Sequence, residues 1–183
     1  MTSTEIPDLR VIEPRVFGDG RGSFSESFRV ERFAAAGLPS IFVQDNVSVS
    51  ARGVVRGLHF QHPRGQHKLV HVVFGEVMDV AVDIRRGSAT YGRWAATCLS
   101  DRNHRQLLVP PGFAHGFAVT SEQAIVVYKC SDYYAPEAEH CIRWDDDELA
   151  IAWPVIEPIV SMKDQAAPLL RDLPAEHLPV FSG

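Results

Sequence analysis

The sequence predicts an all-β protein whose strands form a sandwich or a barrel. Between Leu9 and Trp153, short apolar or alternating runs are separated by Gly, Pro, Asn and Asp, and helical periodicity is nearly absent. The clearest pattern is KLVHVVFGEVMDVAVDIRR, residues 68–86, in which two β-branched runs flank Gly75 and Glu76. These two runs predict a long β-hairpin. Strands at this density are typical of paired or closed sheets.

The remaining elements follow from the same punctuation. We expect strands over residues 9–17, 40–49, 54–60, 93–99, 106–109, 117–120, 124–131 and 141–144. A short helix is predicted over residues 30–36, ended by Gly37 and Pro39, and a weaker one over residues 145–150. The 183 residues fit a single domain, residues 1–183, and the proline-rich tail, 166–183, is expected to wrap the surface or to fray.

Charge and composition exclude several classes of protein. The formal net charge of -5 argues against a nucleic-acid partner, although it does not exclude a small anionic ligand. We find no secretory signal and no apolar stretch long enough to cross a membrane. The three cysteines, Cys98, Cys130 and Cys141, lack CxxC spacing, which favours reduced thiols and a cytoplasmic location.

Several polar side chains with catalytic uses occur in strand-like segments. They are His59 in GVVRGLHFQ, Lys68 at the start of residues 68–86, His115 in PPGFAHGF, Tyr128 in IVVYK, and Asp164 in SMKD. Each has a structural alternative: a surface lysine, a capping aspartate, or a core tyrosine or histidine. Together in a barrel interior they would be costly unless paired or solvated, and function is the usual reason for such a cost.

Strand alternation assigns faces within the His59 segment. It places Arg56, Leu58 and Phe60 on one face and Gly57 and His59 on the other, unless a bulge at Gly57 intervenes.

A second group of residues suits an anionic, flat ligand. Arg21 in GDGRGSF and Arg56 carry guanidinium forks that match a pyrophosphate, and Glu26 lies between them in the sequence. Tyr133 and Tyr134 offer a stacking face for a base, although they could equally form an aromatic cluster at a strand end.

These residues stand in segments that closely resemble the dTDP-4-dehydrorhamnose 3,5-epimerase family, metal-free enzymes of the cupin fold. The matching segments run in order from about Pro7 to Leu170: FGDGRGSFSESF, FVQDN, GVVRGLHFQ, QHKLV, GEVMDVAVDIRRGSATYG, LVPPGFAHGF, YKCSDYY, IRWDDDELAIAWP and SMKD. The resemblance implies a cupin-type jelly-roll barrel or sandwich with a few short helices. It also implies a dTDP-linked 4-keto-6-deoxy sugar as substrate, and no cofactor.

The resemblance also assigns roles. It implies that His59 is the base, Tyr128 the acid, Asp164 the partner that orients His59, and Lys68 the group that faces the oxyanion. Substrate contacts are implied for Arg21, Glu26, Gln44, Asn46, Arg56, His115, Glu139 and Lys163, while Tyr134 is expected to stack on thymine. The family forms homodimers in which N-terminal strands cross over, so Arg21 and Glu26 are expected to serve the neighbouring subunit's site.

Three other functions are compatible with part of this residue set. The nearest is an epimerase that inverts only carbon 3 or carbon 5, because related enzymes keep much of this residue set. The eight histidines favour a metal-dependent cupin oxygenase, but His59 is followed by Phe60 and Gln61, so the two-histidine motif of metal cupins is absent and no metal is expected. A catalytically silent nucleotide-sugar binding module is disfavoured by the retained catalytic set.

Overall fold

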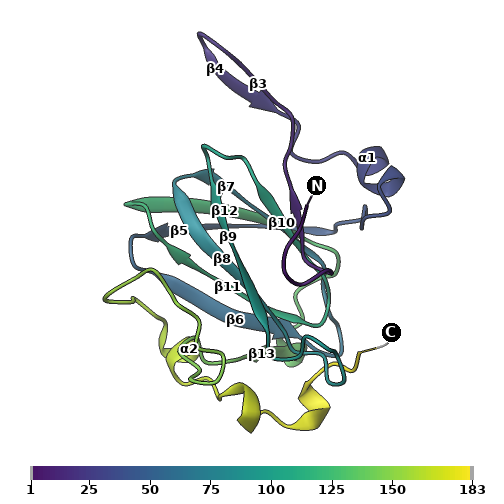
Figure 1. Cartoon of the computed structure of the whole chain (residues 1–183), viewed down its shortest axis with the longest axis vertical. Helices are drawn as coiled ribbons and strands as arrows, with labels where there is room; N and C mark the ends of the chain where they lie inside the picture. The colour runs from purple at the N-terminus through teal and green to yellow at the C-terminus, as the bar shows by residue number, and fades with distance from the viewer. Residues whose placement is uncertain (1, 182–183) are drawn as a thin grey trace.

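The computed structural model describes residues 2–181 and consists of two antiparallel sheets packed face to face, with a two-stranded arm projecting from one end (Figure 1). The all-β prediction is therefore confirmed. The six-stranded sheet has the order β1 (Thr2–Ser3), β2 (Arg10–Ile12), β10 (Gln106–Val109), β7 (Lys68–Phe74), β12 (Gln123–Cys130) and β5 (Gln44–Ala51). The five-stranded sheet has the order β13 (Glu139–Cys141), β6 (Val55–Gln61), β11 (Phe113–Val119), β8 (Glu76–Asp83) and β9 (Trp94–Ser100).

The remaining elements lie outside these sheets. The arm pairs β3 (Val16–Asp19) with β4 (Gly22–Ser25), and α1 (Val30–Ala35) follows it. The short helix α2 (Met162–Gln165) and the 3-10 helices η1 (Pro136–Ala138), η2 (Leu170–Asp172) and η3 (Ala175–His177) lie in the C-terminal half of the chain. Within the described residues, none of the helices has the length and hydrophobicity needed to span a bilayer.

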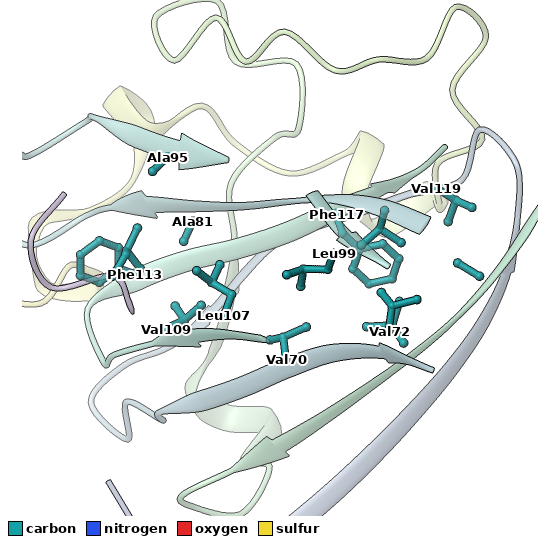
Figure 2. Close-up of a cluster of buried hydrophobic side chains, with 14 of the residues drawn as sticks. Val70, Val72, Ala81, Ala95, Leu99, Leu107, Val109, Phe113, Phe117 and Val119 are labelled. Atoms are coloured by element: carbon teal, nitrogen blue, oxygen red, sulfur yellow. The ribbon is translucent and has the colours of Figure 1, made fainter. Parts of the chain in front are cut away.

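The main core fills the space between the two sheets (Figure 2). Val70, Val72 and Leu107 enter it from the six-stranded sheet, whereas Leu99 and Phe117 enter it from the five-stranded sheet. Burying a side chain of this size contributes about 1.5 to 3 kcal/mol, so this shared layer is what holds the two sheets at a fixed separation.

Two smaller apolar layers cover the outer faces. Leu58 and Phe60 pack outside the five-stranded sheet, against C-terminal residues that include Leu170 and Leu178. On the opposite side, Phe33 of α1 packs with Leu69 and Leu108. The C-terminal layer is important for the site, because it brings α2 against β6.

The predicted hairpin over residues 68–86 is wrong. Its two runs do form β7 and β8, but β7 pairs with β10 and β12, while β8 pairs with β11 and β9. The chain changes sheets at Gly75, whose φ is +79° and whose Cβ, were there one, would stand 2.0 Å from the carbonyl oxygen of Gln123. Local sequence shows two strands and a turn, but other strands occupy both edges of each run, and three of these four neighbours, β10, β11 and β12, are distant in sequence.

The other predicted elements differ mainly at their boundaries. The expected strand 106–109 is β10 without change, and helix 30–36 is α1, one residue shorter. The run 9–17 is divided between β2 and β3, 40–49 begins only at Gln44, 117–120 is the end of β11, and 141–144 begins where β13 ends.

The predicted helix over residues 145–150 is wrong, because those residues form turns. The carboxylate of Asp146 accepts hydrogen bonds from the backbone N–H groups of Glu148, Leu149 and Leu170. An aspartate that bonds nearby N–H groups favours a turn over a helix interior.

The sheet change at Gly75 gives a prediction about stability. Gly75→Ala places a methyl group against the Gln123 carbonyl in a left-handed backbone conformation, and we expect a loss of at least about 3 kcal/mol in the free energy of unfolding. Gly92→Ala is the matched control, since its φ is +75° and a Cβ there would meet nothing within 4 Å. It should cost only about 1 kcal/mol. Urea unfolding measures both, and equal losses would contradict the steric account.

Candidate active site

A pocket of about 270 Å³ lies between the two sheets, at the end where β13 joins β6. His59 enters from β6, whereas Lys68 and Tyr128 enter from β7 and β12 of the opposite sheet. The complete lining is Gln44, Asn46, His59, Phe60, Gln61, Gln66, Lys68, Tyr128, Cys130, Tyr134 and Glu139. Seven of the residues singled out in the sequence are therefore gathered here, from segments far apart in the chain.

A bulge in β6 turns His59 toward this pocket. In the pairing with β11, His59 lies opposite His115 and Arg56 lies opposite Phe117, so β6 uses one more residue than β11 over the same distance. Paired residues share a face, and Arg56 and His59 therefore point the same way. Simple alternation predicted that Arg56 shares a face with Leu58 and Phe60, and this prediction is wrong. Leu58 and Phe60 pack in the outer apolar layer, whereas Arg56 lies on the same face as His59.

His59 is held by a carboxylate from the C-terminal layer. Asp164 of α2 is buried, and its Oδ1 lies 2.7 Å from Nε2 of His59. Ser161 caps α2 by accepting the N–H of Asp164, and the N–H of Gly57 donates to Asp164 Oδ2 at 3.3 Å. Burial alone would raise the pKa of Asp164, but its contacts with His59, Gly57 and Ser161 outweigh the burial and lower that pKa. The carboxylate is thus ionised and keeps Nε2 as its donor, which leaves Nδ1 of His59 as the acceptor nitrogen.

Lys68 and Tyr128 form the facing wall. Nζ of Lys68 lies 3.5 Å from the backbone oxygen of His59, and Tyr128 lies beside it on the neighbouring strand. Burial lowers the pKa of Lys68 and raises the pKa of Tyr128. A phenol with a raised pKa retains its proton, so Tyr128 is protonated at neutral pH.

A hydrogen-bonded group frames the mouth of the pocket. The hydroxyl of Tyr134 donates to Glu139 Oε2 at 2.8 Å, and Lys163 forms an ion pair with the same oxygen. Gln44 accepts the N–H of Tyr134 at 2.8 Å and donates to Asn46 at 3.0 Å. Burial would raise the pKa of Glu139, but Lys163 and Tyr134 together lower it. This frame fixes the exposed ring of Tyr134 at the entrance.

Six of the thirteen candidate residues do not line this pocket; Asp164 and Lys163 contact residues that do, and the other four lie elsewhere. Arg21 lies at the turn of the arm, exposed and bonded to Asp19, while Glu26 pairs with two arginines near α1. Nε of Arg56 donates to Ser50 Oγ at 3.0 Å. His115 is buried behind His59, with Nε2 2.9 Å from Asp79.

Sequence reasoning missed two residues of the interior. Asp79 is fully buried, and its position between Val77 and Ala81 on the inward face of β8 was a signal that a polar partner must exist. Cys130, two residues after Tyr128, shares its face and lines the pocket next to Asn46, whose Nδ2 lies 3.6 Å from Sγ.

Comparison with known proteins accords with this geometry. Residues 3–172 match the family model described as dTDP-4-dehydrorhamnose 3,5-epimerase. A dTDP-4-dehydrorhamnose 3,5-epimerase of Pseudomonas aeruginosa is 53% identical over 173 residues, which cover 93% of this chain and 96% of that protein.

Solved structures give the same result. The structure is similar to a dTDP-6-deoxy-D-glucose-3,5-epimerase of Legionella pneumophila in complex with dTDP-4-keto-L-rhamnose, with a TM-score of 0.96, 51% identity and coverage of 99% and 97% of the two chains. It is also similar to a 3'-monoepimerase of Streptomyces bikiniensis in complex with dTDP-quinovose, with a TM-score of 0.92, 38% identity and coverage of 98% and 93%.

These likenesses confirm the cupin-type fold and the resemblance noted in the sequence. They extend over nearly the whole chain at 38% to 53% identity, well beyond what a shared fold alone would give. This protein belongs to the dTDP-4-dehydrorhamnose 3,5-epimerase family.

Proposed function

We propose that this protein inverts carbons 3 and 5 of dTDP-4-dehydro-6-deoxy-D-glucose to give dTDP-4-dehydro-L-rhamnose. The observation that carries the proposal is that a histidine base and a tyrosine acid enter one pocket from opposite sheets. Both carbons flank the ketone at carbon 4, so loss of either proton gives an enolate.

His59 is the group that removes the proton. Its Nδ1 is the acceptor, because Asp164 holds Nε2 at 2.7 Å. Imidazole is the side chain most often used for proton transfer near neutral pH, which suits His59 to this step. The buried carboxylate of Asp164 then stabilises the imidazolium that forms.

Lys68 stabilises the enolate oxygen. Its ammonium stands in the pocket near the backbone of His59, and the oxygen becomes negative only after the proton has left. A preorganised cation at that place favours the transition state over the ground state. The charge on the enolate also compensates for the burial that lowers the pKa of Lys68.

Inversion requires a second proton source on the other face of the sugar. Tyr128 lies on β12, in the sheet opposite the strand that carries His59, and its raised pKa keeps it protonated. A sugar ring held between the sheets would present one face to each group. Tyr134 at the mouth supports stacking of the thymine, and the side chains of Gln44, Asn46, Glu139 and Lys163 supply polar contacts there.

We further propose that the protein is a homodimer in the cytoplasm. The arm exposes Phe17, Phe24 and Val16, and an isolated two-stranded ribbon is only marginally stable in water. A second copy that covers the arm would also receive Arg21 from it. The three cysteines are unpaired, which suits a reducing compartment.

Turnover in heavy water tests the reaction. With the proposed substrate, we expect deuterium at both carbon 3 and carbon 5 of the product, read by proton NMR. Uptake at carbon 3 alone would instead favour the single-carbon epimerase, which the likeness to the S. bikiniensis monoepimerase keeps as the second candidate. Absence of uptake in the presence of tight dTDP binding would identify a silent binding module.

Two variants separate the base from the acid. His59→Asn should abolish both exchange and inversion, because an amide does not accept the proton. Tyr128→Phe should lose inversion but retain some exchange with solvent, since His59 can still remove a proton and return one to the same face. If Tyr128→Phe inverts at a rate near that of the wild type, another group is the acid.

Subunit complementation tests the dimer and the crossing arm together. Arg21→Ala and His59→Asn chains are inactivated separately, then unfolded, mixed and refolded. If Arg21 serves the partner's site, one of the two sites in each mixed dimer has both wild-type residues, and statistical mixing restores about a quarter of wild-type activity.

If Arg21 acts within its own chain, the mixture contains no site with both residues and stays inactive. Light scattering on the same samples gives the mass. A monomer with full activity would overturn the dimer.

A further inference from the structure

We propose that the catalytic dyad, together with Cys141, forms an inhibitory site for Zn²⁺. A ring nitrogen of His59, Sγ of Cys141 and a carboxylate oxygen of Asp164 all lie within 4.8 Å of one another, and Nε2 is the ring nitrogen that contacts Asp164. Among residues 2–181, this is the single group of three or more His, Cys, Asp and Glu side chains gathered closely enough to hold a metal ion. Cys141 has no part in the proposed reaction.

The distances suit a small tetrahedral ion. Zinc bonds of about 2.0 Å to nitrogen or oxygen and 2.3 Å to sulfur place neighbouring ligand atoms roughly 3.3 to 3.8 Å apart. Sγ of Cys141 is 3.7 Å from Asp164 Oδ1, which already fits. The 2.7 Å contact between His59 and Asp164 must open by less than about 1 Å.

The ligand chemistry and the surroundings also suit zinc. Nitrogen, thiolate and carboxylate are the three donor types that zinc uses in proteins, and three protein ligands leave a fourth position for water. The side chain of His59 is 33% exposed, so the ion has access from the pocket. Asp164 is held from behind by Gly57 and Ser161, so one ligand is already fixed in place.

Bound zinc would prevent His59 from acting as the base, because it changes which ring nitrogen carries the proton. In the apo dyad, Nε2 carries the proton and donates it to Asp164, and Nδ1 keeps its lone pair. When Nε2 binds the metal, the single proton of the neutral ring moves to Nδ1, which then has no lone pair to accept a proton from the sugar. Inhibition thus rests on the proposed function, whereas binding of the metal does not.

Coordination of the ion converts the thiol of Cys141 into a bound thiolate, and the thiol proton passes to solvent. The binding step therefore balances with one proton released for each ion bound.

Calorimetry with ZnSO₄ on the EDTA-treated, desalted protein tests the site without substrate. We expect one ion per chain, loss of epimerase activity in proportion to occupancy, and recovery with EDTA. Co²⁺ should give the thiolate charge-transfer absorption that reports a Cys ligand. Cys141→Ser and Cys141→Ala should each bind at least about tenfold more weakly, the size of loss known even for disturbed supporting contacts.

Cys98→Ser is the matched control, because Cys98 is exposed and outside the group, and its zinc affinity should equal that of the wild type. Zinc binding that survives both Cys141 variants, or that leaves activity intact, would overturn the proposal. If the chain binds zinc at Cys141 but shows no deuterium exchange in EDTA, the metal site stands and the proposed function fails.

Discussion

The packing of two antiparallel sheets through one shared interior is the constraint on which the site depends. Sheets that pack face to face stand about 10 Å apart, and the side chains of both must fill that space. Over most of its length the space is filled by residues such as Val72, Leu99 and Phe117, as Figure 2 shows. At the end near β13 it opens into the pocket, where the same separation leaves room for a sugar between His59 and Tyr128. The core therefore sets the distance between the proposed base and the proposed acid.

An interior that holds catalytic groups must also satisfy them when no substrate is bound. His59 is paired with Asp164, and His115 behind it is paired with the fully buried Asp79. Each pair gives a histidine a fixed orientation, because a carboxylate accepts from only one of its nitrogens at a time. Among the residues that the structure describes, no carboxylate lies within hydrogen-bonding distance of Lys68, which contacts a backbone oxygen at 3.5 Å. Its incomplete pairing leaves the ammonium available for an oxygen that becomes negative during the reaction.

The sequence predicts the strands better than it predicts how they pair. Residues 106–109 and 30–36 were placed almost to the residue, because their apolar pattern and Gly or Pro boundaries are local. The hairpin at Gly75 failed, since the choice between a turn within one sheet and a step to the other depends on β10, β11 and β12, which are far away in the chain. The turn at Asp146 failed for a related reason, because one of its three N–H partners belongs to Leu170.

The candidate site likewise has features that the local sequence predicts and features that depend on distant contacts. His59, Lys68 and Tyr128 could be singled out as polar residues in strands, and alternation then gives their neighbours, Cys130 among them. The direction of His59 could not be derived, because it depends on a bulge whose presence is decided by pairing with β11. The approach of Asp164 depends on the C-terminal layer, in which Leu170 and Leu178 dock on Leu58 and Phe60. Family resemblance supplied that contact in advance, whereas physical reasoning from the residues alone did not.

The pair of His59 and Asp164 also shows a consequence of holding the proposed base in a fixed orientation. Asp164 must be buried and ionised to hold Nε2 of His59, so it lies beside groups that tolerate a carboxylate, and one of these is the thiol of Cys141 at 3.7 Å. The feature that keeps the proposed base oriented is a buried, ionised carboxylate that is held in place by Gly57 and Ser161. Such a carboxylate also favours metal binding, because a ligand that is already deprotonated and oriented lowers the free-energy cost of binding the ion. The hydrogen bond at 2.7 Å favours the dyad over a bound ion when zinc is scarce. In the two proposals taken together, the strength of the hydrogen bond between His59 and Asp164 sets the balance between catalysis and inhibition by zinc.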